Sequence, residues 1–330
     1  MSREQDLLKA IKGYKEALKV INRIDSPFEY SNFHLLIGDA YTQYAIIRDP
    51  VKNAILAIEA FKEAQKVFTI DTFPIKYAAT QDGIGISYRI LVNVGINPLQ
   101  NAGLAIEAFK EALKIRTIGV FPIDYATTQN NLGNLYATLA QISDREKNTA
   151  LAIEAFKDAL KIRTIGTFPL DYAMTQNNIG VAYATLAMVK DKENNVVLAI
   201  EAFKAALKAY TIDTFPFQYA ATKNNIGVAY TTLAEVRDKE RNLFLAIEAY
   251  KEALKIRTID AFPIDYAVAK NNIGNTYFAL AQVKDKEANL KTAIIAYKEA
   301  LRIYTGNAFP DNYKHLNVNI EKAESLLKQE

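Results

Sequence analysis

The sequence contains no cysteine, so it has no disulfide, no thiolate nucleophile and no cysteine metal site. No stretch approaches the ~18 consecutive apolar residues that a membrane-spanning helix requires. The opening segment MSREQDLLKA is charged and lacks the apolar run of a signal peptide. From these absences we expect a cytoplasmic protein with no membrane contact.

Chemistry-bearing groups are equally scarce. The two histidines, His34 and His315, lie near opposite ends of the chain, and we expect each to be a packed or surface side chain. Forty basic and thirty-seven acidic residues are interspersed, which gives a formal charge of +3 and no basic patch for nucleic acid. No acid–base pair or nucleophile stands out. We therefore expect no enzyme activity, no cofactor, no metal and no nucleic-acid partner.

What the sequence does contain is a repeat. Seven prolines follow one another at steps of 47 or 48 residues, and a tyrosine follows each of them by three residues: Pro27, Pro74, Pro122, Pro169, Pro216, Pro263 and Pro310. A fixed period of this size is typical of a solenoid, whose units bury their apolar faces against their neighbours. Length alone would favour two domains, but the period predicts one array over residues 1–330.

Each period contains two expected helices. The first begins at the proline, whose φ suits a first helical turn. The second follows an asparagine that we expect to be its N-cap: Asn53, Asn101, Asn148, Asn195, Asn242 and Asn289. Asp144, Asp191, Asp238 and Asp285 are interpreted as solvated loop charges or helix ends. With a capping helix in 1–24, six helix pairs in 25–309 and a capping helix in 310–330, the fold class is all-α, an αα-hairpin solenoid of about fourteen helices.

The phrase NNLGNLY (130–136), followed by AIEAFKDAL (152–160), resembles the tetratricopeptide repeat. The longer phrase ALKIRTIGTFPLDYAMTQNNIG (159–180) is similar to arrays of the kinesin-light-chain type. This resemblance implies a right-handed superhelix whose first helices line a concave groove for a peptide or partner helix, with nothing catalytic. The period here exceeds the usual 34 residues, so pitch and groove width do not carry over.

A helical wheel of the fourth first helix separates its faces. Ile179 and Tyr183 belong to the core stripe, whereas Asn177, Val181 and Met188 lie on the face that looks onto the groove. Corresponding residues of the other copies complete the predicted peptide-binding set: Asn130, Asn134, Asn177, Val181, Met188, Asn224, Val228, Asn271, Asn275 and Phe278. The adjacent asparagines lie on a shoulder, where we expect structural bonds: Asn131, Asn178, Asn225 and Asn272.

An amide offers one acceptor and two donors, which match an extended peptide backbone. In kinesin-light-chain-like arrays such an asparagine ladder is associated with peptide binding. Four amides that form two hydrogen bonds each would stabilise the complex by roughly 8 kcal/mol at best. Association and ordering of the partner cost about 4–15 kcal/mol. We therefore expect a partner with apolar anchors and micromolar affinity. The alternatives are a merely solvated polar face and a self-associating solenoid, a homo-oligomer without a groove ligand. A neutral groove line disfavours RNA and the acidic tails of chaperones.

The second copy departs from the others. It has Asp82 and Gly83 in place of the asparagine pair, and it places Arg89 on the expected groove face. Its loop 91–100 is apolar, which indicates either burial against the array or an exposed contact patch.

Overall fold

The computed structural model describes residues 3–329, so residues 1, 2 and 330 of the expected domain lie outside it. The described chain forms fourteen α-helices and no strand, which confirms the all-α class. The first seven are α1 (Arg3–Ala17), α2 (Pro27–Ile47), α3 (Pro50–Ala64), α4 (Pro74–Asn93), α5 (Pro98–Ile115), α6 (Pro122–Leu139) and α7 (Arg145–Leu160). The others are α8 (Pro169–Leu186), α9 (Lys192–Ala206), α10 (Pro216–Leu233), α11 (Lys239–Leu254), α12 (Pro263–Leu280), α13 (Lys286–Leu301) and α14 (Pro310–Leu327).

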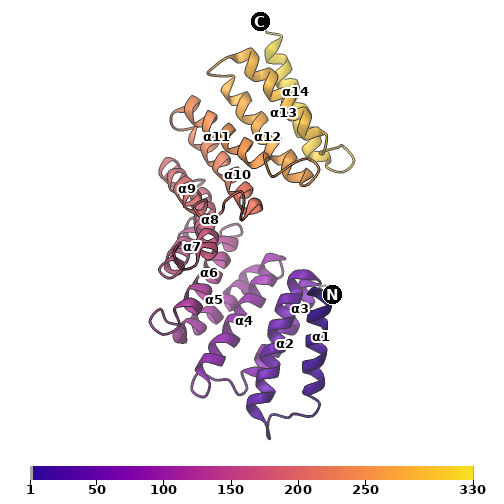
Figure 1. The fold of residues 1–330 in the computed structure, drawn as a ribbon, viewed down its shortest axis with the longest axis vertical. Coiled ribbons are helices and arrows are strands. Elements are labelled where there is room, and N and C mark those ends of the chain that lie inside the picture. Colours follow the sequence, from indigo (N-terminus) through magenta and orange to yellow (C-terminus); the bar gives the residue numbers. More distant parts are fainter. Residues whose placement is uncertain (1–2, 330) are drawn as a thin grey trace. The chain divides into compact units, whose positions relative to one another are not determined.

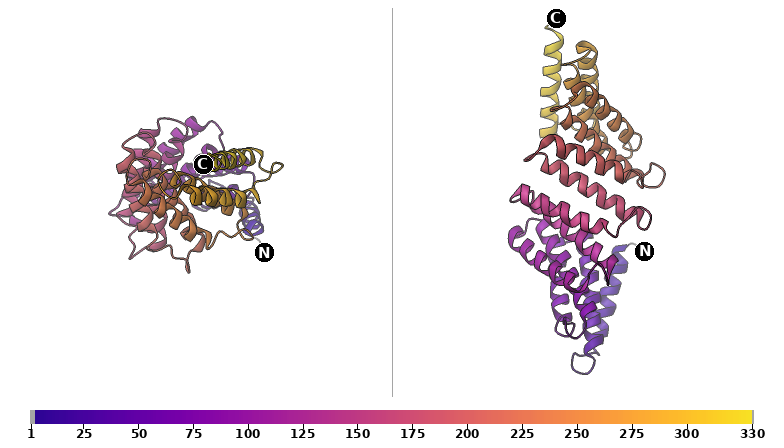
Figure 2. Two further views of the ribbon diagram at one scale, coloured as in Figure 1. Left: turned by 90° about the horizontal axis from the view of Figure 1, so that it is seen from above. Right: turned by 90° about the vertical axis from the view of Figure 1, so that its left-hand side faces the viewer.

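The helices group into two compact units, one ending at Arg163 with α7 and one beginning at Thr164 before α8. Within each unit, consecutive helices run antiparallel and form helical hairpins (Figures 1 and 2). The first unit holds α1 and three hairpins, and the second holds three hairpins and α14. The helical-repeat architecture is thus confirmed, whereas one solenoid domain over the whole chain stays a prediction.

Each of the seven expected prolines is the first residue of a helix, and these are the even-numbered helices α2 to α14. The residue before each proline is kept out of the helical region, as with Phe168 at φ −137° and ψ 66°. The tyrosine three residues later fixes this helix to its hairpin partner. Tyr77 donates to Glu111 at 3.0 Å, and Tyr266 donates to Glu299 at 2.7 Å.

The predicted N-caps of the second helices are wrong: the observed N-cap residues lie four residues earlier in the sequence. Each begins after a residue in the left-handed region, usually aspartate, with φ between 32° and 45°. Asp144 and Asp191 also accept a backbone N–H of the first turn, at 3.2 and 3.4 Å. The recurring asparagines are buried inside the helix, where Asn195 Nδ2 donates to the Lys190 carbonyl at 2.7 Å. The same bond recurs in every hairpin and ties the loop to its helix.

The two helices of a hairpin approach closely at one glycine. A Cβ at Gly180 would lie 2.5 Å from the ring of Phe203, which is 1% exposed in the core. The same glycine–aromatic contact is present in all six hairpins. Only a residue without a side chain allows the ring this position.

No helix of residues 3–329 is both long and apolar enough to cross a membrane. Over the same range, histidine and carboxylate side chains nowhere gather in a group that could hold a metal ion. His34 packs against Tyr30 with ring centroids 4.6 Å apart, and His315 is exposed beside Asn319. Both histidines therefore match the expected packed and surface roles.

Candidate functional site

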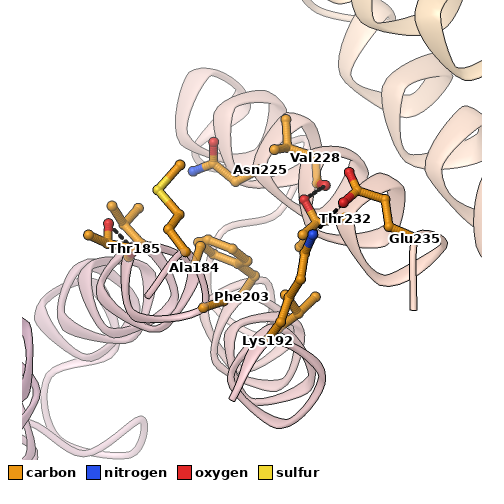
Figure 3. A pocket seen from close by; sticks show the side chains of 13 residues that line it. Ala184, Thr185, Lys192, Phe203, Asn225, Val228, Thr232 and Glu235 are labelled. Atoms are coloured by element: carbon orange, nitrogen blue, oxygen red, sulfur yellow. Dashed lines mark hydrogen bonds and ion pairs between the residues drawn. The ribbon is translucent and has the colours of Figure 1, made fainter. Parts of the chain in front are cut away.

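A pocket of about 540 Å³ opens in the second unit between α8, α9 and α10 (Figure 3). Ala184 on α8 and Val228 on α10 face each other across it, and the buried ring of Phe203 on α9 lies beneath them. The alanine leaves space that a larger side chain would fill. The pocket is therefore an apolar depression on the faces of the proline-starting helices.

Charged and polar side chains form the rim of this pocket. Lys192, at the start of α9, reaches Glu235 after α10 and pairs with it (Figure 3). Both side chains are well exposed, so the pair contributes little to stability. Thr185 and Thr232 bond to backbone carbonyls of their own helices, at 3.0 and 3.1 Å. The rim therefore keeps hydrogen-bonding groups around an apolar floor.

Three of the predicted binding residues come together at this pocket. Val181 and Val228 are each 44% exposed, and Met188, just after α8, is 73% exposed. Asn225 also lines the pocket and points its carboxamide into it (Figure 3). Asn225 belongs to the second asparagine set, for which we expected only structural bonds. Its position on the shoulder of the helix, beside the groove face, was the signal that could have predicted its place in the pocket.

The first asparagine set lies deeper than expected. Asn130 is only 7% exposed, so its placement on an open face is wrong. Asn177, Asn224 and Asn271 are half-buried. The Asn177 carbonyl accepts a hydrogen bond from Thr222, on the next proline-starting helix, at 3.2 Å. The neighbouring helix therefore covers part of this position.

The amides of Asn224 and Asn271 lack the threonine partner that Asn177 has. The Oδ1 atoms of Asn224 and Asn271 are buried without a hydrogen bond. Thr222 lies 45 residues after Asn177, and the equivalent positions after Asn224 and Asn271 are Ala269 and Leu316. Neither replacement has a hydroxyl, so the carbonyls are left unsatisfied, an arrangement that is rare and costly in folded proteins.

The remaining predicted residues lie on other hairpins. Asn275 on α12 is exposed, and its carbonyl accepts from the Tyr297 hydroxyl at 2.9 Å. Phe278 on α12 and Asn134 on α6 are half-buried. None of these three lines the α8–α10 pocket, so the predicted set does not form one continuous site within either unit.

The equivalent face of the first unit is charged. Arg116 Nη1 lies 3.1 Å from Asp82 Oδ2, and Thr128 donates to Asp82 Oδ1 at 2.9 Å. Burial raises the pKa of Asp82, and the charge of Arg116 opposes that rise. Asp39 on α2 keeps contact with solvent, yet the surrounding helices desolvate its carboxyl and raise its pKa to about 6, with a further rise from Asp82.

Comparison with known proteins identifies the repeat. A family model described as "Tetratricopeptide repeat" matches residues 129–164 and 274–307, which contain the hairpin contacts of α6 with α7 and of α12 with α13. Two hairpins of the chain therefore match the tetratricopeptide repeat. The expected family resemblance is thereby confirmed.

The solved structure of BtubC (BKLC) from P. vanneervenii is similar to this repeat chain. The match covers 77% of this chain and 89% of that one, at 20% sequence identity and a TM-score of 0.50. At this identity the likeness concerns the fold alone. A comparison with curated protein sequences found no match.

Proposed function

We propose that this tetratricopeptide chain is a non-enzymatic scaffold that binds a peptide or partner segment along its proline-starting helices. The observation that carries the proposal is the α8–α10 pocket, where Val181, Met188 and Val228 leave apolar surface exposed beside polar rim groups. Helical-repeat proteins use such extended faces to bind partners. The partner inserts an apolar side chain into the pocket.

The asparagines then act on the backbone of the partner. Asn224 and Asn271 form no side-chain hydrogen bond within the described chain, and since their Oδ1 atoms are buried, only their amide N–H groups would bind a ligand. Asn177 shares its carbonyl with Thr222 and keeps its amide N–H groups for binding. Asn275 and Phe278 extend this contact to α12 within the second unit. Asn134 and Asn130 are separate candidates on α6 of the first unit, and Asn130, which is 7% exposed, contributes least.

The pocket supplies the larger share of the affinity. Burying one leucine or phenylalanine side chain stabilises a complex by about 1.5–3 kcal/mol, which is roughly ten- to a hundredfold in affinity. An aspartate at Val181 or Val228 would place a carboxylate where that side chain inserts. Loss of one anchor should therefore weaken binding at least tenfold.

The test is a selection of displayed random peptides on the purified chain. We expect the selected peptides to share an apolar residue and to bind with micromolar affinity by calorimetry. Val181→Asp and Val228→Asp should each weaken that binding at least tenfold. The matched control is Ile295→Asp on α13, a position that is 63% exposed and does not line the pocket.

Circular dichroism must show that all three variants unfold at the wild-type temperature. Peptides that bind the wild type and both pocket variants equally well would contradict the assignment of the pocket. A selection that yields no binding peptide would contradict the proposed function itself.

Self-association is the second candidate, and loop 91–100 favours it. Leu91 and Val92, in the last turn of α4, are buried at 4% and 2%, whereas Val94, Ile96 and Leu99 are 41%, 39% and 59% exposed. The segment is therefore buried at its start, and its remainder exposes apolar surface. A dimer through this patch should show a mass that rises with concentration in light scattering and returns to the monomer value in Leu99→Glu. A constant monomer mass would exclude it.

A further inference from the structure

Helix α1 has the sequence of a second helix of a hairpin, but no proline-starting helix precedes it. Its segment YKEALK (14–19) is identical to residues 250–255 of α11. In that hairpin the ring of Tyr250 packs so closely on α10 that a Cβ at Gly227 would lie 2.5 Å from it. Only two residues come before α1 in the sequence, and α1 packs on α2, the helix that follows it. Within residues 3–329, α1 therefore has no counterpart of α10.

The face of α1 that would meet such a counterpart is open. In α11 the three positions of this face are at most 2% exposed: Ala246, Tyr250 and Ala253. The equivalent residues of the other five hairpins are at most 1% exposed. In α1 the same positions are Ala10, Tyr14 and Ala17, and all three are only half-buried. Helix α1 therefore keeps the residues of a hairpin interface without the helix that covers them.

Glu16 is a carboxylate that lacks the tyrosine of its counterparts. In α10, Tyr219 lies three residues after the proline and donates to Glu252 of α11 at 3.1 Å. Lys255 pairs with the same carboxylate at 2.6 Å. Lys19 pairs with Glu16 at 2.7 Å in the same way, but no tyrosine of the described chain donates to Glu16. A carboxylate has lone pairs for one more donor, so α1 presents an unfilled acceptor beside its open face.

A second copy of the chain does not supply the helix that fits. Its helices α2 to α12 that start with proline already have hairpin partners, which leaves only α14. On α14, Glu321 stands where α10 has Gly227, so a carboxylate would meet the ring of Tyr14. Lys314 stands where α10 has Ala220, which is 0% exposed. Docking of α14 would desolvate both charges without partners, which is costly. The fitting helix therefore belongs to another protein.

We propose that α1 docks an amphipathic helix of another protein, which completes a hairpin as α10 does with α11. The six paired proline-starting helices define its sequence: proline, tyrosine three residues later, then a small residue, and glycine eight residues after the tyrosine. The glycine admits the ring of Tyr14, and the tyrosine donates to Glu16. The interface continues one that the chain forms six times. It shares no residue with the α8–α10 pocket.

Binding of a synthetic helix to the full chain tests the proposal. The probe is a fluorescently labelled peptide of residues 215–236, which contains α10, and anisotropy measures its binding. We expect saturable binding by the wild-type peptide. A peptide with Gly227→Glu, which copies Glu321 of α14, should bind at least about tenfold more weakly. No saturable binding of the wild-type peptide, or equal binding of both peptides, would overturn the proposal.

Two variants of the chain locate the peptide on α1. Ala17→Arg places a charged side chain on the open face and should weaken binding at least about tenfold. Leu8→Arg is the matched control, because Leu8 is 45% exposed and its equivalent Ile55 stays 43% exposed although α3 has a hairpin partner. Helix α1 uses other residues for its core with α2, so both variants should unfold at the wild-type temperature. Equal binding by both variants would refute docking on α1.

A double-mutant cycle tests the tyrosine–carboxylate bond. Glu16→Ala in the chain introduces the residue that α9 has at this position, Ala205, and Tyr219→Phe changes the peptide. Each change should weaken binding about fivefold, and the two together should weaken it no further. Additive losses would contradict the proposed docking geometry.

Light scattering of the chain alone tests the other occupant. A mass that rises with concentration in the wild type, but not in Ala17→Arg, would assign the open face to a second copy and overturn the proposal. We expect the same mass in both. None of these probes changes Val181 or Val228, so this proposal and the proposed function can fail separately.

Discussion

Ala269→Thr should stabilise the second unit by restoring a hydrogen bond that one repeat lacks. Asn177 Oδ1 accepts from Thr222 at 3.2 Å, whereas Asn224 Oδ1 is buried without a partner because Ala269 takes the threonine's place. A threonine at 269 would bring its hydroxyl to Asn224 as Thr222 brings its own to Asn177. The equivalent position holds threonine at 1% exposure in α10, so the helix layer accommodates that side chain.

The expected gain is about 1 kcal/mol. A hydrogen bond that satisfies this isolated carbonyl contributes at least about 1 kcal/mol. Replacement of alanine by threonine inside a helix costs up to about 0.7 kcal/mol. For a unit of this size, a net gain of about 1 kcal/mol raises the unfolding temperature by about 2–4 °C.

Thermal and urea unfolding, followed by circular dichroism, measure the effect. Ala269→Val is the matched control, because it adds the same bulk to α12 without a hydroxyl. In a double-mutant cycle, Ala269→Thr and Asn224→Ala should show a coupling of about 1 kcal/mol. If Ala269→Val stabilises as much as Ala269→Thr, or if the coupling is zero, the hydrogen-bond argument is refuted.

Three further changes test the packing and the charges of the two units. Gly180→Ala would drive a Cβ to 2.5 Å from the Phe203 ring and should destabilise by about 1–3 kcal/mol, while Gly166→Ala, with no atom near its Cβ, should be neutral in the same urea titration. Asn195→Ala removes a 2.7 Å bond to a loop carbonyl and should cost about 1–3 kcal/mol; an unchanged urea midpoint would show that the bond is not stabilising. The carboxyl of Asp39 should titrate by NMR near pH 6, because desolvation by the surrounding helices and the charge of Asp82 raise its pKa. Because the folded form then binds the proton more tightly than the unfolded form, the Asp39 contribution to stability should fall between about pH 4 and 6, less steeply than for a fully buried group, and Asp39→Asn should abolish this dependence.

The period of the prolines was sufficient to predict the helical hairpins and the starts of their first helices. Proline restricts its own φ and the residue before it, so the boundary at Pro169 follows from local geometry alone. The second helices were misplaced because asparagine is a good N-cap and was accepted as one. The true cap is an aspartate in a left-handed conformation four residues earlier, as Asp191 precedes Asn195. Aspartate is one of the few residues that tolerate this conformation, so the recurring aspartates were themselves a local signal for the cap.

The binding face was harder to predict because the proline-starting helices are covered on several sides. Val181, Met188 and Val228 are exposed, as the helical wheel predicted. Asn177 lies at the margin of this exposed face, where a helical wheel cannot tell an open face from a groove between adjacent helices. Only the Thr222 hydroxyl, 45 residues away in sequence, settles where its carbonyl points.

The unsatisfied carbonyl of Asn224 links this stability argument to binding, and one substitution tests the link. Ala269→Thr would occupy that carbonyl without touching Val181, Val228 or any other residue of the pocket. Because that carbonyl is buried, partner peptides can use only the amide N–H groups of Asn224. Their affinity for Ala269→Thr should therefore be unchanged or improved, since the side chain is held in place. Calorimetry on the selected peptides measures the affinities, with Ala269→Val as the control for bulk, and a several-fold loss of binding confined to Ala269→Thr would contradict the use of the N–H groups alone.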